Sequence, residues 1–343
     1  MKAFSCRICD SPLFFENSTC VTCGAVLAYS CPEHDIVPLE EDGTYVDADD
    51  VRWYRCANLE LSDCTWLTDV EGGQCFSCDL TRTRPNDADA KGLSQFGVAE
   101  AAKRRLVVEL DARGLPIVGR EEDPEGGLCF DLLSSVAENV VIGHDNGVIT
   151  IDLAEGDDAH RAKVQAQLDE PYRTMLGHFR HEVGHYYEGV LVGDGPLRAD
   201  YRALFGDESV DYQEQIDRHY AEGPPQDWAE SYISTYATMH PFEDFAETFA
   251  HWMHISETID SARAQALVTV DPDAFSLFAD LVNGVWVPLS VALNQINRAM
   301  GRDDLYPFVI APPVLDKLEF VAALTRPHAA ASQPPASGAN LAL

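Results

Sequence analysis

The first quarter of the chain holds cysteines at spacings that limit how it can fold. Nine of the ten cysteines lie within residues 1–78, and they include two Cys-x-x-Cys pairs, Cys6/Cys9 and Cys20/Cys23. Each such pair turns two thiolates toward one point, so two pairs can complete a tetrahedral four-cysteine zinc site. A second site of this kind is predicted from Cys56, Cys64, Cys75 and Cys78.

These spacings predict a zinc-ribbon module over residues 1–88. A module of this size buries little apolar surface, so zinc binding would supply much of its folding free energy. Residues 1–90 contain 17 Asp and Glu but only 6 Lys and Arg. This acidity argues against the nucleic-acid role of many zinc ribbons and favours a protein partner, or a role in positioning the ribbon against the rest of the chain.

Other roles for the cysteines fit the sequence less well. A disulfide framework is typical of secreted chains, whereas no export signal precedes Cys6. Redox catalysis by a Cys-x-x-Cys pair would need a βαβ context, which the pattern does not predict. Cys31 and His34 have Cys-x-x-His spacing but are predicted not to bind metal. Cys129 lies in an apolar run and is predicted to be a small buried side chain.

Residues 181–185 read His-Glu-Val-Gly-His within a predicted helix. Histidines four residues apart leave the same face of a helix, so His181 and His185 can share one metal ion. Glu182 projects beside them, where its carboxylate can act as a base toward a metal-activated water. Such a short pattern also arises by chance, and it would then mark an ordinary amphipathic helix with two polar histidines.

A zinc site with an open fourth position needs a third protein ligand. A second helix is predicted to start at Pro241, with an aromatic stripe on one face and Glu243 and Glu247 one turn apart on another. We expect Glu243 to be the third ligand. We expect Glu247 to accept the outer N–H of a ligating histidine, which would fix its tautomer. The neighbouring Asp244 is expected to be solvated.

The two motifs together, His-Glu-x-x-His and then Glu-x-x-x-Glu on a later helix, resemble those of the gluzincin metallopeptidases. The stretch Glu-Asp-Phe-Ala-Glu at 243–247 is similar to the version in anthrax lethal factor. This resemblance implies that Tyr236, seven residues before Glu243, donates a hydrogen bond that stabilises the oxyanion. The alternative is a packed tyrosine with a satisfied hydroxyl, and His240 is a weaker candidate for the same role.

A zinc ribbon followed by such a domain also resembles the bacterial family of putative zinc-binding metallopeptidases. The resemblance rests on residues 54–58, 178–187 and 204–208 and covers nearly the whole chain except the tail. It implies a zinc-dependent peptidase with one catalytic and two structural zinc ions and a peptide or protein substrate. Two other functions stay open: a catalytically silent zinc-binding interaction protein, and a zinc hydrolase of another amide or ester.

The remaining pattern predicts an α+β chain in which the ribbon precedes a mainly helical domain at 89–325. The resemblance implies that this domain is a gluzincin-like metallopeptidase domain. Predicted helices cover residues 95–112, 158–169, 172–191 and 313–325. Predicted strands at 128–133, 140–142 and 148–153 would form a small antiparallel sheet with a hairpin turn at 144–147. The last strand is expected to lie at the sheet edge. The resemblance to gluzincins implies that such a strand holds extended substrate, and the alternative is an ordinary edge strand. Residues 326–343, rich in Ala, Pro and Ser, are predicted to be disordered.

The charge of the chain limits its partners. The formal net charge is −33, which opposes binding to nucleic-acid phosphates and other polyanions. No apolar run is long enough to cross a membrane, and no signal-peptide core precedes the first cysteine. We therefore expect a cytoplasmic protein without membrane or nucleic-acid partners.

Overall fold

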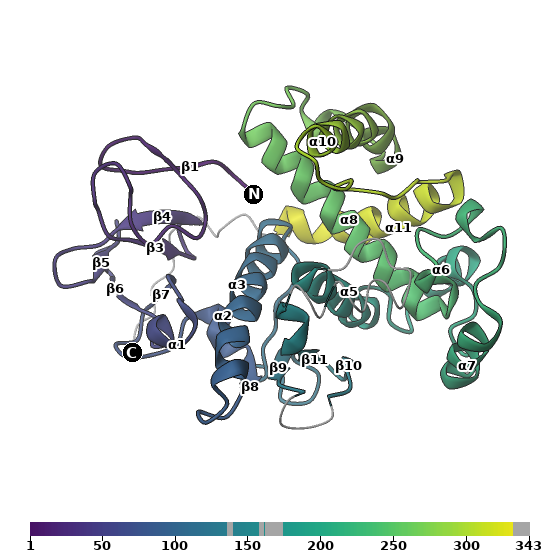
Figure 1. Cartoon of the computed structure of the whole chain (residues 1–343), viewed down its shortest axis with the longest axis horizontal. Coiled ribbons are helices and arrows are strands. Elements are labelled where there is room, and N and C mark those ends of the chain that lie inside the picture. The colour runs from purple at the N-terminus through teal and green to yellow at the C-terminus, as the bar shows by residue number, and fades with distance from the viewer. Residues whose placement is uncertain (136–139, 158–160, 162–173, 332–343) are drawn as a thin grey trace.

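The computed structural model describes residues 1–135, 140–157, 161 and 174–331 of the 343-residue chain. The ribbon lies on one side of the long helix α3 (Ala90–Ala112), and the later helices lie on the other side (Figure 1). An N-terminal module of short strands followed by a helical domain with small sheets confirms the predicted α+β class. The predicted helix at 158–169 falls almost wholly outside the described residues, as does the tail from 332 onward.

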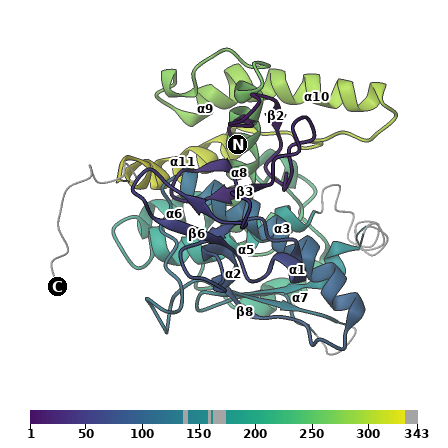
Figure 2. The ribbon, with the colours of Figure 1, turned by 90° about the vertical axis from the view of Figure 1, so that its left-hand side faces the viewer.

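Short antiparallel strands build the ribbon. β1 (Phe4–Ser5) pairs with β2 (Pro12–Leu13), β3 (Leu27–Ser30) pairs with β4 (Asp35–Pro38), and β6 (Arg52–Arg55) lies between β5 (Tyr45–Val46) and β7 (Leu67–Thr68). Two short helices, α1 (Leu59–Ser62) and α2 (Phe76–Asp79), follow β6 and β7. The ring of Tyr29 lies 4.9 Å from that of Trp66 and 5.1 Å from that of Phe15. Seen from the ribbon side, β3 and β6 lie in front of the helices (Figure 2).

Helix α3 joins the ribbon to the rest of the molecule. Its N-cap, Asp89, accepts a hydrogen bond from the backbone N–H of Gly92, so the helix starts before the predicted residue 95. Arg104 donates to the carbonyl of Ser62 in α1, and α3 also packs on α5 (Met175–Tyr187). Buried side chains of the ribbon, α3 and the later helices form one continuous hydrophobic cluster. The two halves of the chain therefore share a core.

A four-stranded sheet has the strand order β10-β11-β9-β8. Its strands are β8 (Thr81–Thr83), β9 (Cys129–Leu133), β10 (Gly143–Asp145) and β11 (Val148–Asp152). The prediction of an antiparallel sheet holds only for β10 and β11, because β8, β9 and β11 run parallel. The connection from β8 to β9 includes helix α3, and the connection from β9 to β11 includes β10. Each connection returns the chain to the same end of the sheet, so the next strand runs parallel to the previous one. Local sequence patterns do not reveal such returns.

The predicted hairpin is present, with a shifted first strand. β10 begins at Gly143, so residues 140–142 are not a strand. Asn146 and Gly147 form a two-residue turn with φ values of 46° and 78°, a geometry that suits hairpins. β11 consequently lies inside the sheet, and the prediction that it is an edge strand is wrong. The edge strands of this sheet are β10 and β8, and β10 contacts α5.

Helices make up most of the remainder. They are α5, α6 (Arg198–Phe205), α7 (Tyr212–Glu222), α8 (Pro241–Ala264), α9 (Phe278–Leu281), α10 (Val287–Ala299) and α11 (Pro312–Ala331). One-turn π-helices at Glu188–Val192 and Val282–Trp286 continue α5 and α9. The helix α11 extends through residues 326–331, which were predicted to be disordered; alanines there favour helix. No helix within the described residues is long and apolar enough to cross a membrane.

A close helix crossing sets up the centre of the molecule. A Cβ atom at Gly184 of α5 would stand 2.9 Å from the Cα of Ala246 in α8. Only glycine allows the two backbones to approach this closely. Fully buried phenylalanines, among them Phe179 on α5 and Phe245 on α8, pack around the crossing. Residues 181–185 therefore face residues 243–247.

Candidate metal centres and active site

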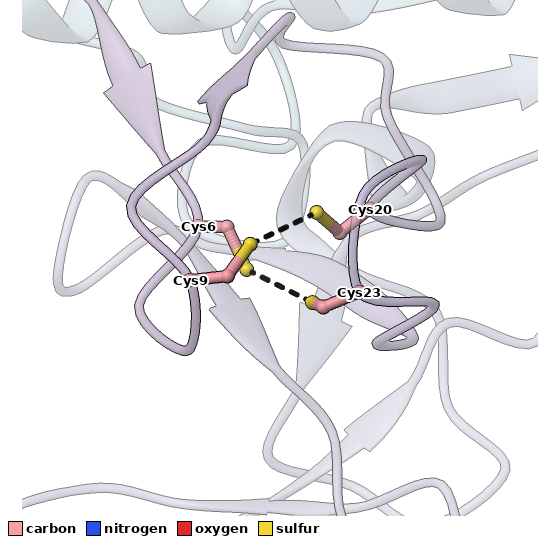
Figure 3. Close-up of side chains that lie close together, drawn as sticks. All are labelled: Cys6, Cys9, Cys20 and Cys23. Atoms are coloured by element: carbon pink, nitrogen blue, oxygen red, sulfur yellow. Dashed lines mark hydrogen bonds between the residues drawn. The ribbon is translucent and has the colours of Figure 1, made fainter.

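The first cysteine cluster comes together as predicted. Cys6 and Cys9 approach Cys20 and Cys23 from the opposite side of a shared centre (Figure 3). The Sγ atoms of Cys6 and Cys23 are 3.7 Å apart, and those of Cys9 and Cys20 are 3.6 Å apart. Tetrahedral Zn–S bonds of ~2.3 Å would separate the sulfurs by ~3.8 Å. The four thiols therefore fit a zinc ion.

The second cluster is formed by Cys56, Cys64, Cys75 and Cys78, which are all buried. The Sγ atoms of Cys64 and Cys75 are 3.6 Å apart. The backbone N–H groups of Asn58 and Cys75 donate to the Sγ of Cys56. Cys78 lies 3.7 Å from a carboxylate oxygen of Glu100, so this cluster sits against α3. Its geometry also fits zinc.

The remaining cysteines and His34 lie outside both clusters. None of the ten cysteines forms a disulfide, so the structure does not support a disulfide framework. Nδ1 of His34 lies 3.1 Å from Oδ2 of Asp111 on α3. Burial raises the pKa of the Cys31 thiol to about 12, which does not favour a metal-binding thiolate. Cys129 is buried in β9 as expected.

Helices α5 and α8 bring a third cluster together. The Nε2 atoms of His181 and His185 are 3.2 Å apart. Oε2 of Glu243 lies 3.0 Å from His181 Nε2 and 3.4 Å from His185 Nε2. Nitrogen and oxygen ligands at ~2.0–2.1 Å from a tetrahedral zinc would be ~3.3–3.4 Å apart. The two imidazoles and the carboxylate therefore fit a zinc ion with three protein ligands.

The carboxylate of Glu247 orients a ligand candidate. Its Oε1 lies 2.8 Å from Nδ1 of His181, the nitrogen that faces away from the cluster, and its Oε2 accepts a hydrogen bond from the Ser234 hydroxyl. Burial alone would raise the pKa of Glu247, but the hydrogen bond from His181 and its charge lower that pKa to about 2. Glu247 thus keeps His181 Nε2 directed at the cluster. This is the contact expected from the sequence.

Glu182 lies next to the cluster without joining it. Its side chain is 7 % exposed, and its Oε2 has no hydrogen-bond partner among the described residues. Burial raises the pKa of Glu182 above its ordinary value, although the imidazoles of His181 and His185 oppose the shift. A buried carboxylate with a raised pKa and a free oxygen is suited to exchange a proton with a water molecule.

Two tyrosines flank the cluster. Tyr236 lies in a 3-10 turn, Tyr236–Thr238, that precedes α8. Its ring lies edge-on to the ring of His181, with 5.6 Å between the ring centroids. Burial raises the pKa of Tyr236 well above its ordinary value, so its hydroxyl stays a hydrogen-bond donor. The hydroxyl of Tyr212, the first residue of α7, donates to Oε1 of Glu243 at 2.5 Å. Tyr212 therefore fixes the carboxylate whose other oxygen faces the histidines.

His240 is excluded from the role of oxyanion donor. Its Nδ1 caps α8 by accepting from the N–H of Phe242, and its Nε2 lies 3.2 Å from the carbonyl of Val210. Both ring nitrogens are thus engaged, and burial lowers the pKa of His240, which keeps it neutral.

The expectation that Asp244 is solvated is wrong. The residue is 1 % exposed, and its Oδ2 lies 2.6 Å from Nζ of Lys317 on α11. Lys317 also donates to the carbonyl of Ser231. Burial raises the pKa of Asp244, and Lys317 opposes the shift. The pair therefore fastens α11 to the helix that carries Glu243.

A cavity of about 680 Å³ opens beside the cluster. Residues of α5, α7 and α8, the turn before α8 and the loop after α10 line it. His181, Glu182, Tyr236 and Glu247 all reach its wall. A volume of this size accommodates a small organic ligand or a few residues of a peptide.

Sequence reasoning missed three residues that support the cluster: Tyr212, Ser234 and His144. The ring of His144, in β10, stacks on that of His185 at 6.5 Å, and its Nε2 accepts from the N–H of Gly147. None of the three lies at a fixed spacing from the histidine motif. Only the folded chain brings them to it, and no local signal marks them.

Comparisons with known proteins agree with this arrangement. Residues 3–89 match a zinc-ribbon domain family. Uncharacterized proteins of Mycobacterium bovis and of two Mycobacterium tuberculosis strains are each 49% identical to the chain over 333 residues, which cover 94% of it and 94% of each relative. No solved structure is significantly similar, and the resemblance to anthrax lethal factor is not shown. Residues 92–324 match the family described as putative zinc-binding metallo-peptidase, and the chain belongs to that family.

Proposed function

We propose that the protein is a zinc-dependent peptidase of gluzincin type in which His181, His185 and Glu243 hold the catalytic zinc. The observation that carries this proposal is the convergence of their three ligand atoms at zinc spacing, with the unpaired carboxylate oxygen of Glu182 beside them. A three-ligand site leaves one position open, which is typical of catalytic rather than structural zinc.

Each residue around the site has a distinct role in peptide hydrolysis. Zinc held there would supply a Lewis acid that acidifies a water molecule and polarises the scissile carbonyl. Glu182 accepts a proton from the attacking water and passes it to the departing amine. Tyr236 donates a hydrogen bond to the oxygen on which negative charge develops. Glu247 and Tyr212 hold His181 and Glu243 in place.

The ribbon would bind two further zinc ions, giving three per chain. Both cysteine clusters have sulfur–sulfur distances suited to a structural zinc. Zinc-binding thiolates persist in reducing compartments, which supports a cytoplasmic location. The acidic ribbon would recruit a protein partner or position the peptidase half, and the net charge of −33 opposes binding to nucleic acid.

Turnover of peptides tests the catalytic assignment. Zinc-loaded wild type, Glu182→Gln and the control Glu222→Gln, which removes an exposed carboxylate on α7, are incubated with a broad peptide library and the products are read by mass spectrometry. We expect cleavage by wild type and by Glu222→Gln that a chelator stops and added zinc restores. Glu182→Gln should cleave at least about a hundredfold more slowly. Wild type that holds three zinc ions and cleaves nothing would contradict the proposal and favour a silent zinc-binding protein.

A further inference from the structure

We propose that the outer face of α10 is a self-association surface, through which two copies of this chain pair as an antiparallel, two-fold symmetric dimer. This inference goes beyond the proposed function, because it concerns a surface that is separate from all three metal-ligand clusters. It holds or fails whether or not the metal centre turns over a substrate.

The surface belongs to one long helix. α9, the π-helical turn at Val282–Trp286 and α10 run without a break over residues 278–299. At ~1.5 Å per residue this helix is ~33 Å long. It lies along the upper edge of the molecule in Figure 2. Its first half is anchored, since Phe278, Val282 and Trp286 are buried. Within α10, in contrast, only Ser290 is buried.

The inner side of α10 is held by the loop that follows it. The side chain of Asn294 donates to the carbonyl of Tyr306 at 2.8 Å and accepts from its N–H at 3.0 Å. The ring of Tyr306 also lies edge-on to that of Trp286, with 4.8 Å between ring centroids. In the part of the chain that the structure describes, α10 has extensive contacts with no helix other than the turn that leads into it. Its opposite side therefore faces solvent.

The solvent side of α10 is apolar. Val291 is 55% exposed, Ile296 is 60% exposed, and Met300, directly after the helix, is 76% exposed. The same side also exposes Val287, Pro288, Ala292 and Ala299. A surface helix ordinarily carries charged residues on this side. An exposed apolar face that runs the length of a helix is typical of an interaction site.

The charge of this region favours a second copy of the same chain as the partner. Residues 281–302 contain no Asp or Glu, although these make up 57 of the 343 residues, about one in six. The single charged residue of α10, Arg298, is already paired with Asp304 at 2.6 and 2.7 Å. Two chains with a net charge of −33 each repel one another over most of their surfaces. A face without acidic residues is where they can approach with the least repulsion.

The ends of the face carry opposite charges at matched positions. Asp280 stands eleven residues before Val291, and Arg302 stands eleven residues after it. Both are exposed, and neither has an ion-pair partner among the described residues. The N–H of Arg302 donates to the carbonyl of Asn297 at 3.0 Å, which keeps this residue at the end of the helix. A two-fold axis at Val291 therefore brings Asp280 of each copy to Arg302 of the partner subunit, as a self-complementary homodimer interface requires.

The apolar area suits a reversible dimer. The larger side chains that expose it are Val287, Val291, Ile296, Met300 and Leu305. One such side chain carries roughly 60–120 Å² of apolar surface, so at their exposures the five present on the order of 250 Å² per copy. With the smaller side chains and the polar edges of two ~33 Å helices, the total for both copies approaches ~1,000 Å². Interfaces of that size associate weakly, so we expect a dissociation constant in the micromolar range.

Sedimentation velocity of the zinc-loaded chain, from low to high micromolar concentration, tests the dimer. We expect monomer to convert reversibly to dimer. Val291→Glu sets two carboxylates against each other at the axis and should raise the dissociation constant at least about a hundredfold, and Ile296→Glu should act in the same direction. The control Val98→Glu makes the same change at an exposed position of α3 and should leave the constant unchanged. Circular dichroism and zinc content verify that each variant is folded.

Charge reversal tests the register. Asp280→Arg alone, or Arg302→Asp alone, sets like charges against each other and should weaken the dimer by about tenfold at low salt. The double variant restores opposite charges across the interface and should return the dissociation constant to within about threefold of wild type. If the double variant were no tighter than the single variants, the antiparallel register would be overturned.

The remaining outcomes decide between occupants of the face. A chain that stays monomeric at every concentration would overturn the dimer. A dimer that both Val291→Glu and Ile296→Glu leave intact would also overturn it, since its interface would lie elsewhere. Flotation with phosphatidylcholine vesicles tests a lipid surface as the alternative. Binding of monomeric wild type to these vesicles, lost in Val291→Glu, would replace the dimer by a membrane contact.

Discussion

Gly184 lies where α5 crosses α8, and replacing it by alanine tests whether close helix approach sets the metal-ligand geometry. The added Cβ would stand 2.9 Å from the Cα of Ala246, 3.1 Å from its carbonyl oxygen and 3.3 Å from its Cβ. Ordinary carbon–carbon contacts are about 3.5–4.0 Å, so the helices must separate by about 0.6 Å or more. Two of these neighbours are backbone atoms, so no side chain can rotate to relieve the contact.

This separation should affect both stability and zinc binding. Overpacking of a close core typically costs about 1–3 kcal/mol. Metal–ligand distances tolerate only about 0.2 Å, and Gly184 lies between the two ligand histidines. We therefore expect Gly184→Ala to lower the free energy of unfolding by about 1–3 kcal/mol and to weaken the catalytic zinc by about tenfold or more.

The assay compares Gly184→Ala with Gly189→Ala, a matched control. Gly189 lies five residues further along, and nothing stands within 4 Å of a Cβ placed there. Urea denaturation measures the free energy of unfolding, and competition with a chromophoric chelator measures zinc affinity, with His185→Ala identifying the catalytic ion. If Gly184→Ala matched Gly189→Ala in both measurements, the close crossing would not be what positions the ligands.

Three further changes probe the contacts around the site. Glu243→Gln should lower catalytic zinc affinity by at least about a hundredfold in chelator competition, whereas Glu222→Gln should not; equal affinities would remove Glu243 from the ligand set. Lys317→Met leaves the carboxylate of Asp244 buried without its partner and should lower the free energy of unfolding by about 3–5 kcal/mol; a loss below about 1 kcal/mol in urea denaturation would show that the pair does not hold α11. Tyr212→Phe removes the hydrogen bond to Glu243 and should weaken catalytic zinc by about tenfold with little effect on stability, because its ring is partly exposed; unchanged affinity would assign the tyrosine no part in positioning.

Much of the metal chemistry could be predicted because it is encoded at short spacing. Histidines four residues apart share a helix face wherever the helix packs, and Cys-x-x-Cys pairs form a knuckle from their own backbone. The predicted contact between Glu247 and His181 also follows from spacing, once α8 is known to face α5. These features need few long-range contacts to specify them.

Features that depend on contacts between segments distant in sequence could not be predicted from local sequence patterns. The parallel pairing of β8 with β9 depends on where α3 delivers the chain. Asp244 follows a ligand on an amphipathic helix and looks like a surface acid, yet it is buried because Lys317 arrives 73 residues later. Tyr212 reaches Glu243 from a separate helix. In each case the deciding partner lies far along the chain, where periodicity carries no information.

The shared core at α3 means that the division near residue 88 is a boundary in sequence but not in folding. The buried cysteines of both clusters belong to the same hydrophobic cluster as Leu106 of α3 and Phe179 of α5. Loss of ribbon zinc would therefore unfold the ribbon, remove its packing against α3 and make the whole polypeptide accessible to proteases. In a cell starved of zinc, the amount of this protein would fall together with its catalytic activity. The supply of zinc would then set how much intact protein the cell contains.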